Sequence, residues 1–411
     1  MQAPAQSNPE AEAPRPAAIV LGLGVTGLAT ARALNAIGVK VHGVSFSKKD
    51  PGRVSRCCHV LVDQPGLDQD DRAFCSWLFG YARSLGDRPV VFPTSDETAL
   101  AMAADRDDLK PVCRIWDNTL DGLEALVRKD RLYKLAASAG ISVPESIVSL
   151  DLDEIRDWCD LHTGPYLAKP FYASHPDAGA VGKNRTFDTG DSMLSFLQGL
   201  SQKSSGLIVQ RLIQGGDGWI YDCYGMCDQT GAVRTMATHR RVRQYLPDFG
   251  ITSYGEVPGD PQSGGQDKLF ELTKHLMDEF HYHGIFGVEW LQERETGKLY
   301  LIDINARPFY TIGHLRDCGL DLPMHAYREL CGNDLTDLQL QPRLKHKYWI
   351  DFVHDIGTFR RTREIGLLSW LGSVLRCRSF AVWSIRDPMP CLHEIWLLIG
   401  SILNRLRRRD S

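Results

Sequence analysis

The chain has 411 residues, of which 43% are apolar and 24% charged, an ordinary composition for a soluble globular protein of more than one domain. The 47 Lys and Arg residues nearly balance the 51 Asp and Glu residues, so the net charge of −4 gives no indication of a nucleic-acid partner. The length excludes a disulfide-stapled mini-protein. The 11 cysteines are odd in number and lack paired Cys-x-x-Cys spacing with His partners, which favours reduced, buried thiols in a cytoplasm.

The first part of the chain predicts a short tail followed by a parallel α/β domain. Residues 1–16 are rich in Ala, Pro and small polar types and are expected to form a disordered tail. The apolar stretch Ala17–Leu34 imitates a signal peptide, but Arg32 interrupts it and three glycines divide it into a strand, a turn and a helix. Strands and helices then alternate over residues 17–115, which favours a Rossmann-like domain with right-handed crossovers. The expected elements are Ile19–Leu23, Leu28–Ile37, Val39–Val44, Ala73–Leu85, Val90–Pro93 and Glu97–Ala104.

Residues 116–335 predict a second domain of a different kind. Its first clear element is the helix Arg131–Ala139, which Gly140 ends. Several of the strands that follow are spaced like hairpins, so an antiparallel sheet is expected. These strands are Tyr166–Pro170, Leu207–Ile213, Trp219–Cys227, Ala232–Thr238, Phe286–Gln292 and Leu299–Asn305. Residues 336–411 form a less regular C-terminal extension.

A glycine-rich turn, Gly22-Leu23-Gly24-Val25-Thr26-Gly27, lies between the first expected strand and helix, which is the context of a dinucleotide-binding loop. The acid that such a site needs about twenty residues later is missing, because Ser45 and Phe46 occupy that position. The alternative is a loop whose glycines serve only a tight turn and close packing. An NAD(P)-dependent oxidoreductase therefore remains one hypothesis.

Two strand segments predict a metal site. On the strand Leu299–Asn305, Asp303 and Asn305 point to one face while the isoleucines beside them point to the other. The turn at residues 294–298 folds the preceding strand back, which brings Glu289 opposite Asp303 if the loop has an odd length or the strand carries a bulge. Three hard oxygen ligands beside the cationic Arg307 suit Mg²⁺ that also binds substrate phosphates. The alternative is a surface hairpin with scattered polar residues.

Two lysines are suited to phosphate. Lys169 lies within an apolar strand, where a buried ammonium needs an anion, unless it is an edge-strand lysine with its head in water. Lys183 belongs to the small, basic loop 177–185, which is suited to lie over phosphates. The alternative is a plain flexible hairpin.

Further polar groups point to the substrate. Arg241 and Arg243 are expected on one face of an extended segment, where they can fork onto a carboxylate or acyl phosphate. The segment 93–97 ends a parallel strand and begins a helix, at the sheet edge where such folds bind ligands. His281 and His283 lack partners at zinc-type spacing and are expected to be ordinary packing or surface residues.

These residues together resemble the ATP-grasp superfamily, and within it the carboxylate–amine ligases of the D-aspartate ligase type. The resemblance covers residues 18–335 and implies an ATP-grasp fold, α/β and α+β, with an N-terminal Rossmann-like pre-ATP-grasp domain and ATP between two α+β subdomains. It implies that Lys129 and Lys169 hold phosphates and that a loop closes over them. That loop contains Gly179, Gly182 and Lys183. The resemblance also implies that the hinge flanking adenine is formed by Gln210, Arg211, Leu212 and Ile213, and that Asp217 binds ribose.

The same resemblance makes Glu289, Asp303 and Asn305 the ligands of one or two Mg²⁺ or Mn²⁺ ions and puts Arg307 near the transferred phosphate. The sequence departs from the family at Gln210, where many members have an acid, and at Asp303, where Glu is usual. The implied reaction joins a small-molecule carboxylic acid to an amine through an acyl phosphate, with release of ADP and phosphate. An amino acid or a cell-envelope precursor is the expected type of substrate, and a non-catalytic nucleotide-binding protein is the remaining alternative.

The C-terminal extension carries two apolar stretches with arginines beside them, Leu367–Leu375 and Ile395–Leu403. Both are too short to span a bilayer. They suit an amphipathic helix lying on an anionic membrane surface, at the inner face of the membrane of an otherwise cytoplasmic protein. The alternative is a C-terminal helix packed on the core with a solvated basic end. The sequence does not indicate an oligomeric state.

Overall fold

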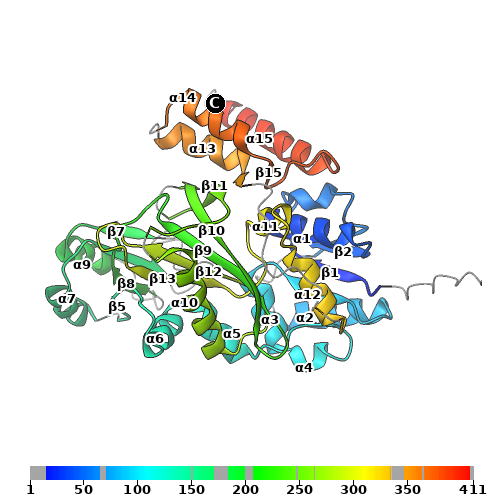
Figure 1. Cartoon of the computed structure of the whole chain (residues 1–411), viewed down its shortest axis with the longest axis horizontal. Helices are drawn as coiled ribbons and strands as arrows, with labels where there is room; N and C mark the ends of the chain where they lie inside the picture. Colours follow the sequence, from blue (N-terminus) through cyan, green and yellow to red (C-terminus); the bar gives the residue numbers. More distant parts are fainter. Residues whose placement is uncertain are drawn as a thin grey trace, which may run out of the picture.

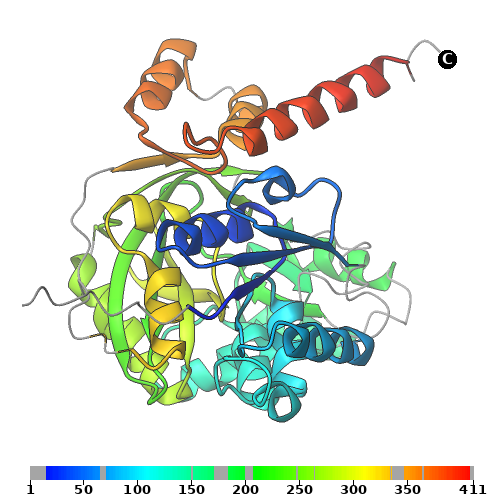
Figure 2. The same cartoon turned by 90° about the vertical axis from the view of Figure 1, so that its right-hand side faces the viewer.

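The computed structural model describes ten stretches of the chain: residues 15–64, 71–149, 151–170, 184–199, 207–246, 249–262, 264–333, 335, 347–362 and 365–407. Residues 1–14 of the predicted tail lie outside them. The N-terminal α/β part and a small sheet with two helices lie on opposite sides of a large central sheet, and three C-terminal helices lie across one end (Figures 1 and 2).

A four-stranded parallel sheet forms the N-terminal part, as the alternating pattern predicts. Its strand order is β3-β2-β1-β4. The strands are β1 (Ala18–Leu21), β2 (Val41–Ser45), β3 (Val60–Asp63) and β4 (Val90–Pro93). Every residue of β1 and β2 is buried, because helices cover both faces of the sheet.

Different helices pack on the two faces of this sheet. On one face lie α1 (Val25–Ala36), α11 (Ile312–Asp317) and α12 (Leu322–Leu330). On the other lie α2 (Asp71–Ser84) and α3 (Asp96–Ala104). The short η1 (Pro51–Val54) and α4 (Arg106–Leu109) complete this part. Since α11 and α12 follow β13 and precede β14 of the large sheet in sequence, they join the N-terminal sheet to that sheet.

The central sheet has seven strands in the order β13-β12-β9-β10-β11-β14-β15. All neighbours are antiparallel except the last pair, β14 and β15. The strands are β9 (Ile220–Cys227), β10 (Val233–Tyr245), β11 (Ile251–Glu256), β12 (Gly284–Gln292), β13 (Leu299–Asn305), β14 (Tyr348–Ile350) and β15 (Ser379–Phe380). This confirms the expected antiparallel arrangement.

Three helices share an apolar core with the central sheet: α5 (Leu120–Val127), α6 (Lys129–Ser138) and α10 (Gly265–Phe280). The core contains Leu132, Leu276 and the fully buried Trp290. The first residue of α6 is therefore fixed beside the ends of β12 and β13.

A second, smaller antiparallel sheet has the order β5-β8-β6-β7. Its strands are β5 (Ser146–Ile147), β6 (Tyr166–Pro170), β7 (Arg185–Phe187) and β8 (Leu207–Arg211). One apolar cluster joins it to α7 (Leu152–Leu161) and α9 (Gly190–Gln198). This sheet faces the central one across the site described below.

The C-terminal extension consists of α13 (Phe352–Thr362), α14 (Leu367–Arg376) and α15 (Met389–Arg407). The two apolar stretches predicted from the sequence lie in α14 and α15. Within the described residues, no helix combines the length and the apolar composition that crossing a bilayer requires.

Candidate active site

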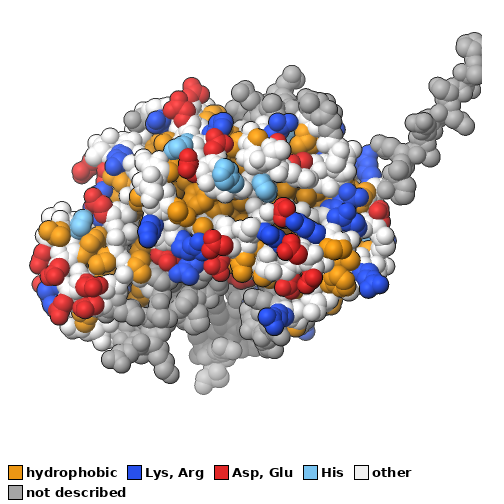
Figure 3. Space-filling model, turned by 90° about the horizontal axis from the view of Figure 1, so that it is seen from below, with side chains coloured by type: hydrophobic (Ala, Val, Ile, Leu, Met, Phe, Trp, Pro, Cys, Tyr) orange, Lys and Arg blue, Asp and Glu red, His pale blue; other side chains and the backbone are white. Residues whose placement is uncertain are grey.

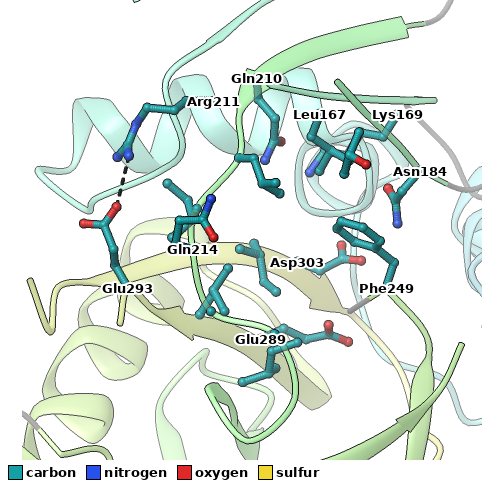
Figure 4. A pocket seen from close by; sticks show the side chains of 18 of the residues that line it. Leu167, Lys169, Asn184, Gln210, Arg211, Gln214, Phe249, Glu289, Glu293 and Asp303 are labelled. Atoms are coloured by element: carbon teal, nitrogen blue, oxygen red, sulfur yellow. Dashed lines mark hydrogen bonds and ion pairs between the residues drawn. The ribbon is translucent and has the colours of Figure 1, made fainter. Parts of the chain in front are cut away.

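A cavity of about 1130 Å³ opens between the small and the central sheets. Its lining comes from α6 and from strands of both sheets, including Lys129, Leu167, Gln210, Arg241, Glu289 and Asp303. Polar side chains of the two sheets point towards each other across this space (Figure 4). The cavity therefore collects most of the described residues that the sequence singled out.

The three predicted metal ligands lie together on one wall. In the register of β12 and β13, Glu289 is directly opposite Asp303, and the strand pairing shifts at the next residue. This irregularity is the bulge that the sequence reasoning required. The Asn305 amide donates to Glu289 Oε1 at 3.1 Å, so all three side chains face the same space. Two carboxylates and an amide oxygen form a hard donor set that is suited to Mg²⁺.

Each of the two acids is paired with a cation. Lys129 Nζ lies 2.9 Å from Asp303 Oδ1, and an Arg241 nitrogen lies 2.6 Å from Glu289 Oε1. Burial lowers the pKa of the Lys129 ammonium, but the Asp303 carboxylate outweighs that effect and holds it above its ordinary value. Burial raises the pKa of the Glu289 carboxyl despite the opposing charge of Arg241. Each carboxylate of this wall is thus paired with a cationic side chain of the same cavity.

Lys169 occupies the opposite wall. It lies in β6, between β8 and β7, and its side chain is only 6% exposed, so the alternative of an edge-strand lysine with its head in water is wrong. Its ammonium donates to the hydroxyl of Tyr133 at 2.8 Å. Burial, reinforced by the charge of Lys129, lowers the pKa of Lys169 from 10.5 to about 7. Among the described residues, this buried amine has no carboxylate in hydrogen-bond contact, so it is suited to receive an anionic ligand.

Arg241 is held by a buried acid that the sequence reasoning missed. Asp222 is fully buried and accepts from Arg241 at 2.7 Å, while its other oxygen lies 3.1 Å from His239 Nδ1. Burial alone would raise the pKa of Asp222, but Arg241 and His239 outweigh it and hold this pKa well below its ordinary value. A single acid within an apolar strand was the available signal, the same one that identified Lys169.

The prediction that Arg241 and Arg243 share a face is wrong. The pairing of β10 with β11 shifts on both sides of Arg243, and this irregularity turns its side chain away from the cavity. Arg243 instead forms a two-fold interaction with Asp355 of α13, at 2.8 Å for each nitrogen. Arg243 is therefore not a substrate-contacting residue in this arrangement.

Arg307 lines the cavity next to the metal wall, and its guanidinium is bound by Asp96 at 2.7 Å. Asp96 is the first residue of α3, in the segment 93–97 that the sequence placed at the ligand-binding edge of the parallel sheet. This ion pair brings the N-terminal sheet into contact with the site.

The predicted adenine hinge also lines the cavity. Gln210, Arg211, Leu212 and Ile213 all belong to its wall, at the end of β8. Arg211 is bound by Glu293 at 3.0 Å, an ion pair that Figure 4 shows at one end of the cavity. Glu293 was missed by the sequence reasoning, because it follows the metal strand without a motif of its own.

Two other predictions for the nucleotide have different outcomes. Asp217 is not among the cavity-lining residues, and its carboxylate accepts from the backbone and side-chain amides of Gln244. The predicted phosphate loop with Gly179, Gly182 and Lys183 lies outside the described residues. Asn184, directly after it, does line the cavity (Figure 4).

The glycine-rich turn has a packing role. Gly22 has a φ of +99°, which favours glycine, and a Cβ on Gly27 would lie 1.8 Å from the carbonyl oxygen of Gly22. These glycines do not line the cavity. Among the described residues there is no group of three His, Cys, Asp or Glu side chains suited to hold a metal.

Comparison with known proteins gives similarity in structure but not in sequence. Neither a family model nor a curated protein matches the sequence. N5-carboxyaminoimidazole synthetase from Staphylococcus aureus superposes with a TM-score of 0.60 at 14% identity, over 81% of each chain. The β,γ-ATP complex of biotin carboxylase from Campylobacter jejuni gives a TM-score of 0.65 at 13% identity, over 80% of this chain and 74% of that one.

A third similar structure is the biotin carboxylase domain of 2-oxoglutarate carboxylase from Hydrogenobacter thermophilus, bound to MgADP and bicarbonate. Its TM-score is 0.62 at 16% identity, over 80% of this chain and 72% of that one. At this level of identity, the likeness concerns the fold. The chain has the ATP-grasp fold with a preceding parallel α/β part, as the sequence resemblance implied.

Proposed function

We propose that this protein is an ATP-dependent carboxylate–amine ligase that forms an amide bond through an acyl phosphate. One observation carries the proposal: a single cavity between two antiparallel sheets combines buried lysines with a wall of hard oxygen ligands. The similar structures support it, because they are named as a synthetase and carboxylases and some are complexes with ADP or β,γ-ATP. An ATP-binding protein without activity would not need the additional arginines Arg241 and Arg307 at the same wall.

In this proposal the phosphates of ATP lie between Lys129 and Lys169. Phosphate oxygens would replace the Tyr133 hydroxyl as the acceptor for Lys169 and would compete with Asp303 for Lys129. Arg307, held by Asp96, is placed to offset negative charge that develops on the transferred phosphoryl group. Lys183 of the loop before Asn184 is proposed to close over the phosphates.

Glu289, Asp303 and Asn305 fit Mg²⁺ as a donor set, and one or two ions of Mg²⁺ or Mn²⁺ would be bound there with phosphate oxygens as further ligands. When bound, the ion neutralises phosphate charge and orients the γ-phosphate. Asp303 and Glu289 must then release Lys129 and Arg241, the cations with which they are paired without the ion. Lys129 and Arg241 are close enough to move from carboxylate to phosphate without leaving the cavity.

Adenine is proposed to lie beside Gln210, Arg211, Leu212 and Ile213. For ribose, the resemblance pointed to Asp217, but Glu293 lines the cavity and contacts the hinge through Arg211. We therefore assign the ribose hydroxyls to Glu293.

The proposed chemistry has two steps. An oxygen of the substrate carboxylate attacks the γ-phosphorus, the bond to the β-phosphate oxygen breaks, and ADP leaves. The amine nitrogen then attacks the acyl carbon, the bond from that carbon to the phosphate oxygen breaks, and the amine loses a proton to solvent. The products are the amide, ADP and phosphate. Arg241, fixed by Asp222, is placed to bind the acyl phosphate.

The substrates are proposed to be a small carboxylic acid and an amine, of the D-aspartate ligase type, with an amino acid or a cell-envelope precursor among them. The proposed division of labour follows the predicted domains: residues 116–335 bind ATP, and residues 17–115 help to bind a substrate at the edge near Asp96.

A thermal-shift titration with MgATP, NADH and NADPH tests nucleotide binding. MgATP at about a hundred times its dissociation constant should stabilise the wild type by about 2.7 kcal/mol. Asp303→Ala should lose this stabilisation, whereas Asp121→Ala, at an exposed position outside the cavity, should keep it. Stabilisation by a nicotinamide nucleotide alone would contradict the proposal and favour the oxidoreductase hypothesis.

Acid and amine pairs can then be screened for ADP release. With a carboxylate labelled with ¹⁸O, the proposed route transfers one labelled oxygen to inorganic phosphate. Label in AMP instead would show adenylate chemistry, and ATP binding without turnover of any pair would favour a non-catalytic protein.

A further inference from the structure

The C-terminal extension presents a large apolar face. Twelve of the twenty exposed large apolar side chains in the described part of the chain fall within residues 367–399. Leu368 is 85% exposed, Ile385 86% and Trp396 69%. We name the exposed apolar side chains of residues 367–399 the C-terminal apolar face. This concentration is far above the scattered apolar residues that a protein surface normally carries.

The face follows the helical repeat. On α15 the exposed residues Met389, Leu392, Trp396 and Ile399 are spaced by three and four, and α14 repeats the pattern with exposed leucines four residues apart. The sequence left open whether the C-terminal helix packs this side on the core. Over residues 392–399 the C-terminal helix does not pack its apolar side on the core, so the alternative of a packed helix is wrong there.

The charges around this face have one sign. Among the described residues from 352 to 401, every exposed charged side chain is an arginine: Arg360, Arg361, Arg376, Arg378 and Arg386. Of the described acids in this region, Asp355 and Asp387 are buried and Glu394 is partly buried. On the opposite side of the molecule, acidic and basic side chains are interspersed (Figure 3). A protein with a net charge of −4 thus carries a local cluster of arginines beside the C-terminal apolar face.

Two buried acids anchor the extension firmly to the body. Asp355 of α13 binds Arg243 of β10 and accepts from Ser253 and from the indole of Trp370. Asp387, just before α15, accepts from Arg32 at 3.0 Å and from Ser55 at 2.7 Å. These contacts hold α14 and α15 at the same end of the molecule, outside the sheets (Figures 1 and 2).

We propose that the C-terminal apolar face docks on the surface of an anionic phospholipid bilayer. Amphipathic helices with Trp and Leu on one side and basic residues beside them insert shallowly at the boundary between headgroups and acyl chains. Trp383 and Trp396 suit that boundary, and the arginines suit anionic headgroups. A symmetric pair of copies of this chain would instead bring the same arginines against each other.

Vesicle co-sedimentation of the full chain tests the proposal, independently of the enzyme activity. Vesicles of phosphatidylcholine are compared with vesicles containing about one third phosphatidylglycerol. We expect binding to the anionic vesicles that weakens as salt rises from about 0.1 M to about 0.5 M, because salt screens the arginines. Absence of binding to the anionic vesicles would overturn the proposal.

Two variants separate the apolar and the basic contributions. The double variant Leu368→Glu and Trp396→Glu should bind at least about tenfold more weakly. The triple variant of Arg376→Gln, Arg378→Gln and Arg386→Gln should lose about a hundredfold on anionic vesicles, since each arginine contributes about fivefold. Because the three arginines are exposed, their replacement should not unfold the protein. Circular dichroism checks that the variant is folded.

The matched control is Leu161→Glu, because Leu161 is 82% exposed at the end of α7 and lies far from the extension in sequence. It should bind vesicles like the wild type. Equal loss in this control would overturn the proposal. Light scattering measures whether the chain is a dimer. If it is a dimer that the changes at Leu368 and Trp396 dissociate, and if it does not bind vesicles, the C-terminal apolar face is a contact between copies. That result would also overturn the proposal.

Discussion

Protonation of Lys169 should control ATP binding. In the ligand-free chain its pKa is lowered to about 7 by burial and by Lys129, whereas an ammonium between phosphates is stabilised in its charged form. ATP binding at pH 8 should therefore take up about 0.9 proton, the fraction of Lys169 that is neutral at that pH. For the same reason the apparent Kd should rise up to about tenfold per pH unit above pH 7.

Isothermal titration calorimetry measures this uptake directly, because the binding heat in buffers of different ionisation enthalpy changes with the number of protons exchanged. Lys169→Met should bind more weakly at every pH and lose the proton uptake. Lys134→Met, at an exposed position on α6, should retain both. Equal uptake in the wild type and in Lys169→Met would refute the assignment of phosphate binding to this lysine.

The same shift has a consequence for stability without ATP. Between about pH 7 and the ordinary value of 10.5, the unfolded chain binds a proton at Lys169 that the folded chain lacks. The contribution of this group to the free energy of unfolding therefore increases with pH in that window, by up to about 1.4 kcal/mol per unit. Lys169→Met should remove that increment.

Two further predictions concern stability and use urea unfolding. Gly27→Ala should destabilise the chain by about 3 kcal/mol or more, because its Cβ would lie 1.8 Å from a backbone oxygen, whereas Gly24→Ala, with nothing within 4 Å, should stay within about 0.5 kcal/mol. Similar effects of the two changes would contradict the packing role of the turn. Asp222→Asn should cost about 3–5 kcal/mol, since it removes the buried charge that binds Arg241. The control is Asp121→Asn, which removes an exposed ion pair and should cost less than about 1 kcal/mol. If Asp222→Asn also cost less than about 1 kcal/mol, Arg241 would be held by other contacts.

Much of the site was predictable because its signals are local. The alternation of β13 puts Asp303 and Asn305 on one face in any structure where this segment is a strand. Lys169 was identifiable because an ammonium within an apolar strand needs an anion or a polar partner. The alternating strands and helices of the first hundred residues likewise determined a parallel sheet, whatever their detailed packing.

Other features depend on irregularities that no local pattern reports. The register shift in β10 sends Arg243 to Asp355, although simple alternation predicts that it lies beside Arg241. Asp217 follows the hinge as the family pattern requires, yet it binds Gln244. For Arg243 a one-residue shift in strand pairing decides where the side chain points, and for Asp217 the position of Gln244 on the neighbouring strand β10 decides its partner.

The sequence by itself thus determined the element types, the face of each strand and the set of charged groups that need partners. The tertiary structure decided which partners they have: Lys129 meets Asp303 across 174 positions of the chain, and Arg307 meets Asp96 across 211. It also decided that the apolar side of α15 stays exposed over residues 392–399. The physical reason is that periodicity is a property of neighbouring residues, whereas burial and ion pairing depend on which distant elements pack together.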